Sequence, residues 1–213
     1  MIGAIAGDII GSIYEWSNIK TKDFPLFGAA CDFTDDTVCT VGIADWLITN
    51  GDLSDTLANY VLRYPTRGYG GMFRDWANQL ERKPYNSWGN GSAMRVSPVA
   101  HFAKDEGEVL ALAEKSSAVT HSHPDGIAGA QATALTMWMA REGANADAIR
   151  QMIFDRFDYD LSQSVEEIRE WYKFDVSSAG TVPQAITCAI EARGYEDAVR
   201  NAVSIGGDTD TIA

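Results

Sequence analysis

Two short acidic stretches carry the residues most able to do chemistry. Two adjacent carboxylates lie between threonines in residues 34–37, and Asp208 and Asp210 alternate with threonines in residues 206–211. Four carboxylates held close together would repel one another and raise one another's pKa unless a cation neutralised them. Their oxygen atoms suit Mg²⁺, Mn²⁺ or Ca²⁺ better than Zn²⁺. The pattern therefore predicts a metal site, provided that the two stretches meet in space.

The N-terminal stretch 2–16 has helical periodicity and carries two further acids. Gly3, Gly7 and Gly11 recur every four residues, and residues four apart share one face of a helix, so a smooth stripe for close packing is expected. Asp8 and Glu15 are seven residues apart, about two turns along the same side. A single acid at a helix end is commonly solvated, so Glu15 is either a surface acid or a functional one.

A glycine-rich loop and a histidine loop are the remaining candidates. Residues 89–92 read Gly-Asn-Gly-Ser and lead into an expected apolar helix. Such a loop can present backbone N–H groups to a phosphate or another anion, or it can be a plain turn. His121 and His123 lie together in a loop before Pro124, where capping or a polar loop is one interpretation and ligand contact is the other.

Composition limits the class of protein. The chain has 213 residues, 46% hydrophobic and 22% charged, with a net charge of −13, which indicates one soluble globular domain. The negative charge disfavours a nucleic-acid or anionic-membrane binder with a broad basic surface. Three cysteines without a Cys-x-x-Cys pattern favour buried thiols in a reducing cytoplasm. Neither a signal peptide nor a membrane-spanning run of about 20 residues is predicted.

Periodicity and turn signals predict a compact all-α, single-domain bundle over residues 1–213, without strands or repeats. The expected helices are 2–16, 36–50, 54–64, 72–82, 106–118, 126–142, 146–157, 164–174, 182–192 and 195–204. Thr34 or Asp35 is expected to cap the second of them. Phe73, Trp76 and Leu80 are expected to share one helix face, and Pro183 to lie in a first turn.

Five phrases occur in order along the chain, at residues 7–15, 34–37, 89–95, 120–124 and 206–211. Together they resemble the ADP-ribosylglycohydrolase family, which includes the dinitrogenase reductase-activating glycohydrolase and the ADP-ribosylarginine hydrolases. The resemblance runs from the first residues to the last, and it implies an all-α fold with a centre of two Mg²⁺ or Mn²⁺ ions.

The resemblance also implies roles for individual residues. One metal ion would be held by Thr34, Asp35, Asp36 and Asp210, and the other by Glu15, Asp208, Asp210 and Thr211. The loop formed by Gly89, Asn90, Gly91 and Ser92, with His121 or His123, would line the ADP-ribose cleft. The family usually continues past its last acidic motif with a packed helix. The domain 1–213 ends two residues after Thr211 and is therefore expected to lack that helix.

The expected reaction is release of ADP-ribose through an oxocarbenium-like transition state. Two metal ions would orient the distal ribose and lower the pKa of a bound water, and Glu15, Asp35 or Asp36 would act as base. The expected substrate is an ADP-ribosylated protein or an ADP-ribose-containing small molecule, with arginine as the first acceptor. Serine, O-acetyl-ADP-ribose and modified nucleic acid stay open as acceptors. The alternatives are a binuclear phosphoesterase or an inactive ADP-ribose-binding relative. A cytoplasmic monomer is expected.

Overall fold

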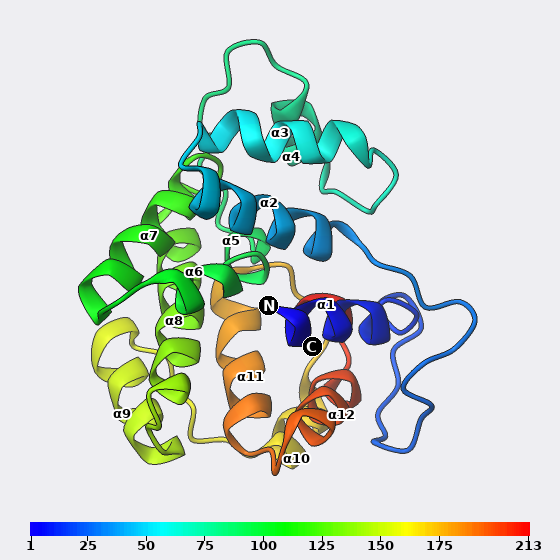
Figure 1. Cartoon of the computed structure of the whole chain (residues 1–213). Helices are drawn as coiled ribbons and strands as arrows, with labels where there is room; N and C mark the ends of the chain where they lie inside the picture. The colour runs from blue at the N-terminus through cyan, green and yellow to red at the C-terminus, as the bar shows by residue number, and fades with distance from the viewer.

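The computed structural model describes residues 1–213, and its regular structure is entirely helical (Figure 1). The only β-type pairing is an isolated antiparallel bridge between Gly89 and Ser177. The helices are α1 (Ile2–Gly11), α2 (Asp35–Thr49), α3 (Leu53–Arg63), α4 (Gly71–Ala77), α5 (Gly91–Met94), α6 (Ser97–Phe102), α7 (Glu106–Ala118), α8 (Pro124–Arg141), α9 (Ala146–Phe157), α10 (Val165–Trp171), α11 (Ser178–Ile190), α12 (Tyr195–Ile205) and α13 (Thr209–Ile212). The all-α prediction is confirmed.

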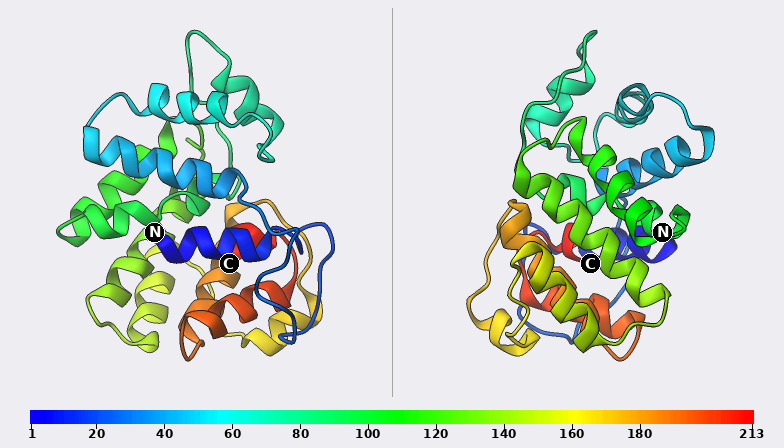
Figure 2. Two further views of the ribbon diagram at one scale, coloured as in Figure 1. Left: turned by 45° about the vertical axis from the view of Figure 1, so that its right-hand side comes forward. Right: turned by 90° about the vertical axis from the view of Figure 1, so that its left-hand side faces the viewer.

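The two ends of the chain meet at the centre of the molecule. Helix α1 packs against α2, α12 and α13, and both views in Figure 2 place the two termini close together. Helix α8, to the left of α1 in Figure 1, packs against α7 and α11. The acidic stretches at residues 34–37 and 206–211 therefore begin two helices that share α1 as a neighbour. None of the helices combines the length and the hydropathy needed to cross a membrane.

The glycine stripe of α1 makes this central contact possible. A Cβ atom added at Gly7 would overlap the backbone of Ala213, and one added at Gly11 would overlap the carbonyl group of Thr209. The Thr209 hydroxyl donates to the Gly11 carbonyl oxygen at 2.8 Å. Close helix packing at the glycines is thus confirmed, and its partner is the last acidic motif.

Helix α2 begins at the predicted cap. Thr34 Oγ1 accepts a hydrogen bond from the backbone N–H of Asp36 at 3.3 Å, and Asn50 ends the helix in the left-handed conformation. The buried carboxylate of Asp8 accepts from the backbone N–H and the hydroxyl of both Thr34 and Thr37. Asp8 therefore joins α1 to the start of α2, a role that its place in the sequence did not predict.

Two predicted helix boundaries were wrong near the candidate site. Helix α1 ends at Gly11, so Glu15 lies in the turn that follows and not on the helix. Helix α11 starts at Ser178 because Ser177 caps it, accepting from the Gly180 N–H at 2.9 Å. Pro183 consequently lies inside α11 and not in its first turn.

Helix α4 is shorter than expected. It ends at Ala77, and Leu80 is fully exposed while Phe73 and Trp76 are buried and stacked on each other. The predicted face with Leu80 was therefore wrong, because the helix ends before the turn that would carry it. The apolar helix expected after residues 89–92 is present as two short helices, α5 and α6. Helix α13 was not predicted, since four residues are too few to show a helical period.

Candidate metal centre

Three carboxylates from opposite ends of the chain converge beside α1. Each of Glu15, Asp208 and Asp210 offers an oxygen atom, and these atoms all lie within 4.8 Å of one another. Glu15 comes from the turn after α1, Asp208 precedes α13, and Asp210 lies within it. The packing of α1 on α13 is thus what brings the glutamate to the last acidic motif.

Hydrogen bonds from Asn18 hold the two segments of this cluster together. Its Nδ2 donates to the carbonyl oxygens of Tyr14 (2.7 Å), Glu15 (2.9 Å) and Gly207 (2.9 Å). Its Oδ1 accepts from the Gly207 N–H at 2.8 Å. Gly206 and Gly207 have φ angles of 74° and 83°, a left-handed conformation that favours glycine. Sequence reasoning missed Asn18, since an exposed asparagine three residues after Glu15 carries no local signal.

The first acidic stretch lies at the start of α2, within electrostatic range of Asp210. The Asp35 N–H donates to the Arg67 carbonyl oxygen at 2.7 Å, and Asp36 is buried with its Oδ2 accepting from the Thr34 hydroxyl at 3.2 Å. After burial, the charge of Asp210 is the strongest influence that raises the pKa of both Asp35 and Asp36. Asp210 is therefore close enough to influence both aspartates, although neither Asp35 nor Asp36 belongs to the group of carboxylates whose oxygen atoms lie within 4.8 Å of one another.

Crowding of these acids perturbs their protonation. Burial, followed by the negative charge of Asp210, raises the pKa of Glu15 and of Asp35 to about 7. Burial and the charge of Asp208 raise the pKa of Asp210 to about 7. Burial also raises the pKa of Asp208, although the hydrogen bond from Asn90 opposes the shift. A divalent cation would neutralise this cluster, and carboxylate and threonine oxygens fit Mg²⁺ or Mn²⁺.

We expect metal binding to change how stability depends on pH. Carboxyl groups whose pKa rises from about 4 to about 7 on folding make the folded chain bind more protons between these values. Without metal, the free energy of unfolding attributable to them is therefore highest near pH 4 and falls as pH rises to about 7. Mg²⁺ or Mn²⁺ binds the ionised groups, so the metal-induced rise in unfolding temperature should grow between about pH 5 and pH 8. Thermal unfolding with EDTA or with metal tests this, and a rise that does not vary with pH contradicts it.

The glycine-rich loop lies next to the acidic cluster through Asn90. Its Nδ2 donates to Asp208 Oδ2 at 2.7 Å and to Thr181 Oγ1 at 3.3 Å. Ser92 is fully buried, and its hydroxyl donates to the Gly126 carbonyl oxygen at 2.7 Å, so its side chain serves the fold. The loop leads into α5, which has only four residues. Among residues 89–92, Asn90 is the one whose side chain contacts the candidate centre.

The two loop histidines occupy different environments. His123 caps α8, with its Nδ1 accepting from the Asp125 N–H at 3.1 Å, which is the capping interpretation left open by the sequence. His121 is buried, and its Nε2 faces Gly91 of the glycine-rich loop. Of the two, His121 is the one that lies at the loop next to the acidic cluster.

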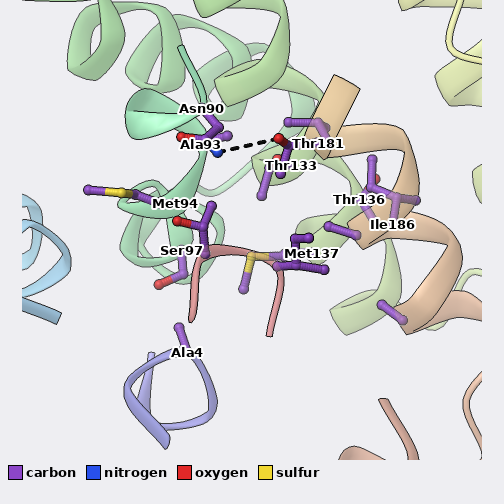
Figure 3. Close-up of a pocket in the computed structure, with 15 residues that line it drawn as sticks. Ala4, Asn90, Ala93, Met94, Ser97, Thr133, Thr136, Met137, Thr181 and Ile186 are labelled. Carbon is purple, nitrogen blue, oxygen red and sulfur yellow. Dashed lines mark hydrogen bonds between the residues drawn. The ribbon is translucent and has the colours of Figure 1, made fainter. Parts of the chain in front are cut away.

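A cavity of about 220 Å³ has Asn90 in its lining (Figure 3). Ala4, Met94, Met137 and Ile186 are among the mostly apolar residues that line it. An apolar lining does not suit a diphosphate, because burying charged groups without partners is costly. The carboxylate cluster, and not this cavity, is therefore the candidate site for chemistry.

The structure is that of a helical protein with a cluster of carboxylates that could hold a metal ion, and comparison with known proteins gives its family. The family model for ADP-ribosylglycohydrolase matches residues 1–213, so the chain belongs to the ADP-ribosylglycohydrolase family. The resemblance in the five sequence phrases is thereby confirmed.

Individual relatives are distant. The chain is similar to ADP-ribosylhydrolase ARH3 of Danio rerio, 25% identical over 289 residues, covering 100% of this chain and 78% of that protein. The human ARH3 is 25% identical over 293 residues, covering 100% of this chain and 81% of the relative. A solved structure titled "ADP-ribosylglycohydrolase-related protein complex" has a TM-score of 0.75 at 23% identity and covers 99% of this chain and 81% of that chain. At that identity, the structural likeness shows the fold alone.

Proposed function

We propose that the protein is a metal-dependent hydrolase that releases ADP-ribose from a modified acceptor, with ADP-ribosyl-arginine on protein as the first substrate to test. Membership of the ADP-ribosylglycohydrolase family supports the reaction class. The observation that carries the proposal is the convergence of Glu15, Asp208 and Asp210 within 4.8 Å, next to the acidic start of α2. A location in the reducing cytoplasm and a monomeric state remain predictions.

Two Mg²⁺ or Mn²⁺ ions fit the available donors. We infer that Thr34, Asp35, Asp36 and Asp210 hold one ion and that Glu15, Asp208, Asp210 and Thr211 hold the other. When bound, such ions orient ribose hydroxyls and lower the pKa of a coordinated water. The carboxylate-only cluster, with no cysteine and no histidine in it, supports a hard cation.

Side chains of the protein would supply the base and would hold the metal ligands in position. Asp36 is buried and accepts from Thr34, which leaves the less buried Glu15 and Asp35 as the better candidates to take a proton from the attacking water. Asn90 holds Asp208 in place through its side-chain amide.

The test is release of free ADP-ribose from an arginine-ADP-ribosylated protein, first with Mg²⁺ or Mn²⁺ and then with EDTA. Release that requires metal is the expected result. The same assay with serine-linked ADP-ribose, O-acetyl-ADP-ribose and modified nucleic acid identifies the acceptor. Release of inorganic phosphate or a nucleotide monophosphate instead would favour the phosphoesterase alternative. Binding of ADP-ribose without any release would favour a non-catalytic relative.

A further inference from the structure

His121 has one ring nitrogen held by the protein and one that is free. Its side chain is buried, and Nδ1 lies 2.8 Å from Thr120 Oγ1. Nε2 has no hydrogen-bond partner in the protein. It nevertheless keeps some exposure to solvent, because it is not one of the fully buried polar atoms that lack a partner. It faces Gly91 so closely that a Cβ added there would lie 3.0 Å from it. The free nitrogen is therefore directed to the glycine-rich loop.

The hydrogen-bond chain behind Nδ1 determines which nitrogen carries the proton. Arg95 is fully buried, and its Nη2 donates to the Ser116 carbonyl oxygen at 2.7 Å and to Thr120 Oγ1 at 2.8 Å. A guanidinium group has donors only, so Thr120 Oγ1 accepts from Arg95. The structure gives the Thr120 hydroxyl hydrogen no acceptor other than His121 Nδ1.

This arrangement defines the state of the imidazole ring. An Nδ1 atom that accepts a hydrogen bond has no proton, and the neutral ring then carries its proton on Nε2. Burial, followed by the positive charge of Arg95, lowers the pKa of His121 well below its ordinary value. The ring is therefore a neutral donor at neutral pH. Arg95 has no carboxylate partner within the protein, which leaves its charge acting on this region.

We propose that Arg95 and Thr120 are positioning residues that fix His121 as an Nε2–H donor toward the Gly89–Gly91 loop, where it donates to an acceptor oxygen of a bound ADP-ribose unit. The identity of the ligand rests on the proposed function, whereas the tautomer rests only on the hydrogen-bond chain. Neither Arg95 nor Thr120 reaches the ligand itself, since both are sealed in the core.

Isotope-labelled histidine and two-bond proton–nitrogen correlation spectra test the tautomer directly. In the unmodified protein, His121 should carry its proton on Nε2 only. Thr120→Val removes the hydroxyl at nearly constant volume, so its His121 should become a mixture of both tautomers. Thr120→Ser keeps the hydroxyl and should restore the Nε2–H form. His123, whose Nδ1 accepts from the Asp125 N–H, is the internal control and should not change.

Calorimetry with ADP-ribose and Mg²⁺ supplies the second measurement. Thr120→Val should bind about tenfold more weakly, as expected for loss of one well-oriented hydrogen bond, and Thr120→Ser within about twofold of the unmodified protein. Thermal unfolding confirms that each variant is folded, and the spectrum of the unmodified protein tests the tautomer even if Thr120→Val does not fold. An Nδ1–H tautomer in the unmodified protein, or an unchanged tautomer in folded Thr120→Val, overturns the inference. If the tautomer and binding behave as expected but no substrate releases ADP-ribose, the inference stands and the proposed function fails.

Discussion

Replacing Asp210 by Asn should reduce metal-dependent release of ADP-ribose by at least about a thousandfold. Asp210 has the largest electrostatic influence on Glu15, Asp35 and Asp36 of any neighbouring charge, and we propose that it would help to hold both metal ions. An amide is similar in shape to a carboxylate but carries no charge, and loss of an essential catalytic group commonly costs this much. The rate of ADP-ribose release at saturating Mg²⁺ and Mn²⁺ measures the effect.

Asp147→Asn is the matched control, because it makes the same chemical change on a side chain that is 95% exposed. Its rate and its unfolding temperature should equal those of the unmodified protein.

Without metal, Asp210→Asn should unfold at a higher temperature than the unmodified protein at pH 8, since one buried repelling charge is gone. Asp35→Asn should lose activity as Asp210→Asn does. Full activity in both variants would disprove the proposed metal centre.

Replacing Gly11 by Ala should damage both stability and metal binding. The added methyl group would overlap the backbone of Thr209 and Asp210. Backbone atoms cannot relieve an overlap by a change of rotamer, as a flexible side chain can. Either α1 or α13 must move, which separates Glu15 from Asp208 and Asp210. We expect a loss of about 1–3 kcal/mol in the free energy of unfolding, typical of overpacking, and metal affinity at least about tenfold weaker.

Chemical denaturation and calorimetry with Mn²⁺ measure the two effects of Gly11→Ala. Gly28→Ala provides the comparison, because a Cβ atom at Gly28 has nothing within 4 Å. That variant should match the unmodified protein in both measurements. If Gly11→Ala binds Mn²⁺ with unchanged affinity, the close contact between α1 and α13 does not position the carboxylates, and this account of the centre is wrong.

Features that depend on neighbours in the sequence could be predicted without the structure. The periodicity of Ala146–Phe157 gave the correct bounds of α9, and Thr34 caps α2 because its hydroxyl reaches an N–H two residues away. The types and spacing of Asp35, Asp36, Asp208 and Asp210 were sufficient to predict a site for hard cations. Capping, periodicity and ligand chemistry act over a few residues, so sequence carries them.

The tertiary structure decided which distant residues meet, and that information is not local. Glu15 meets Asp208 and Asp210 across nearly the whole chain because glycines of α1 allow α13 to approach. Asn18 donates a hydrogen bond to Gly207, Arg95 donates one to Thr120, and Thr120 is hydrogen-bonded to His121. No local sequence pattern identifies these partners. Such contacts follow from the packing of all the helices together, so the sequence by itself determined the chemistry available, and only the fold determined where it is assembled.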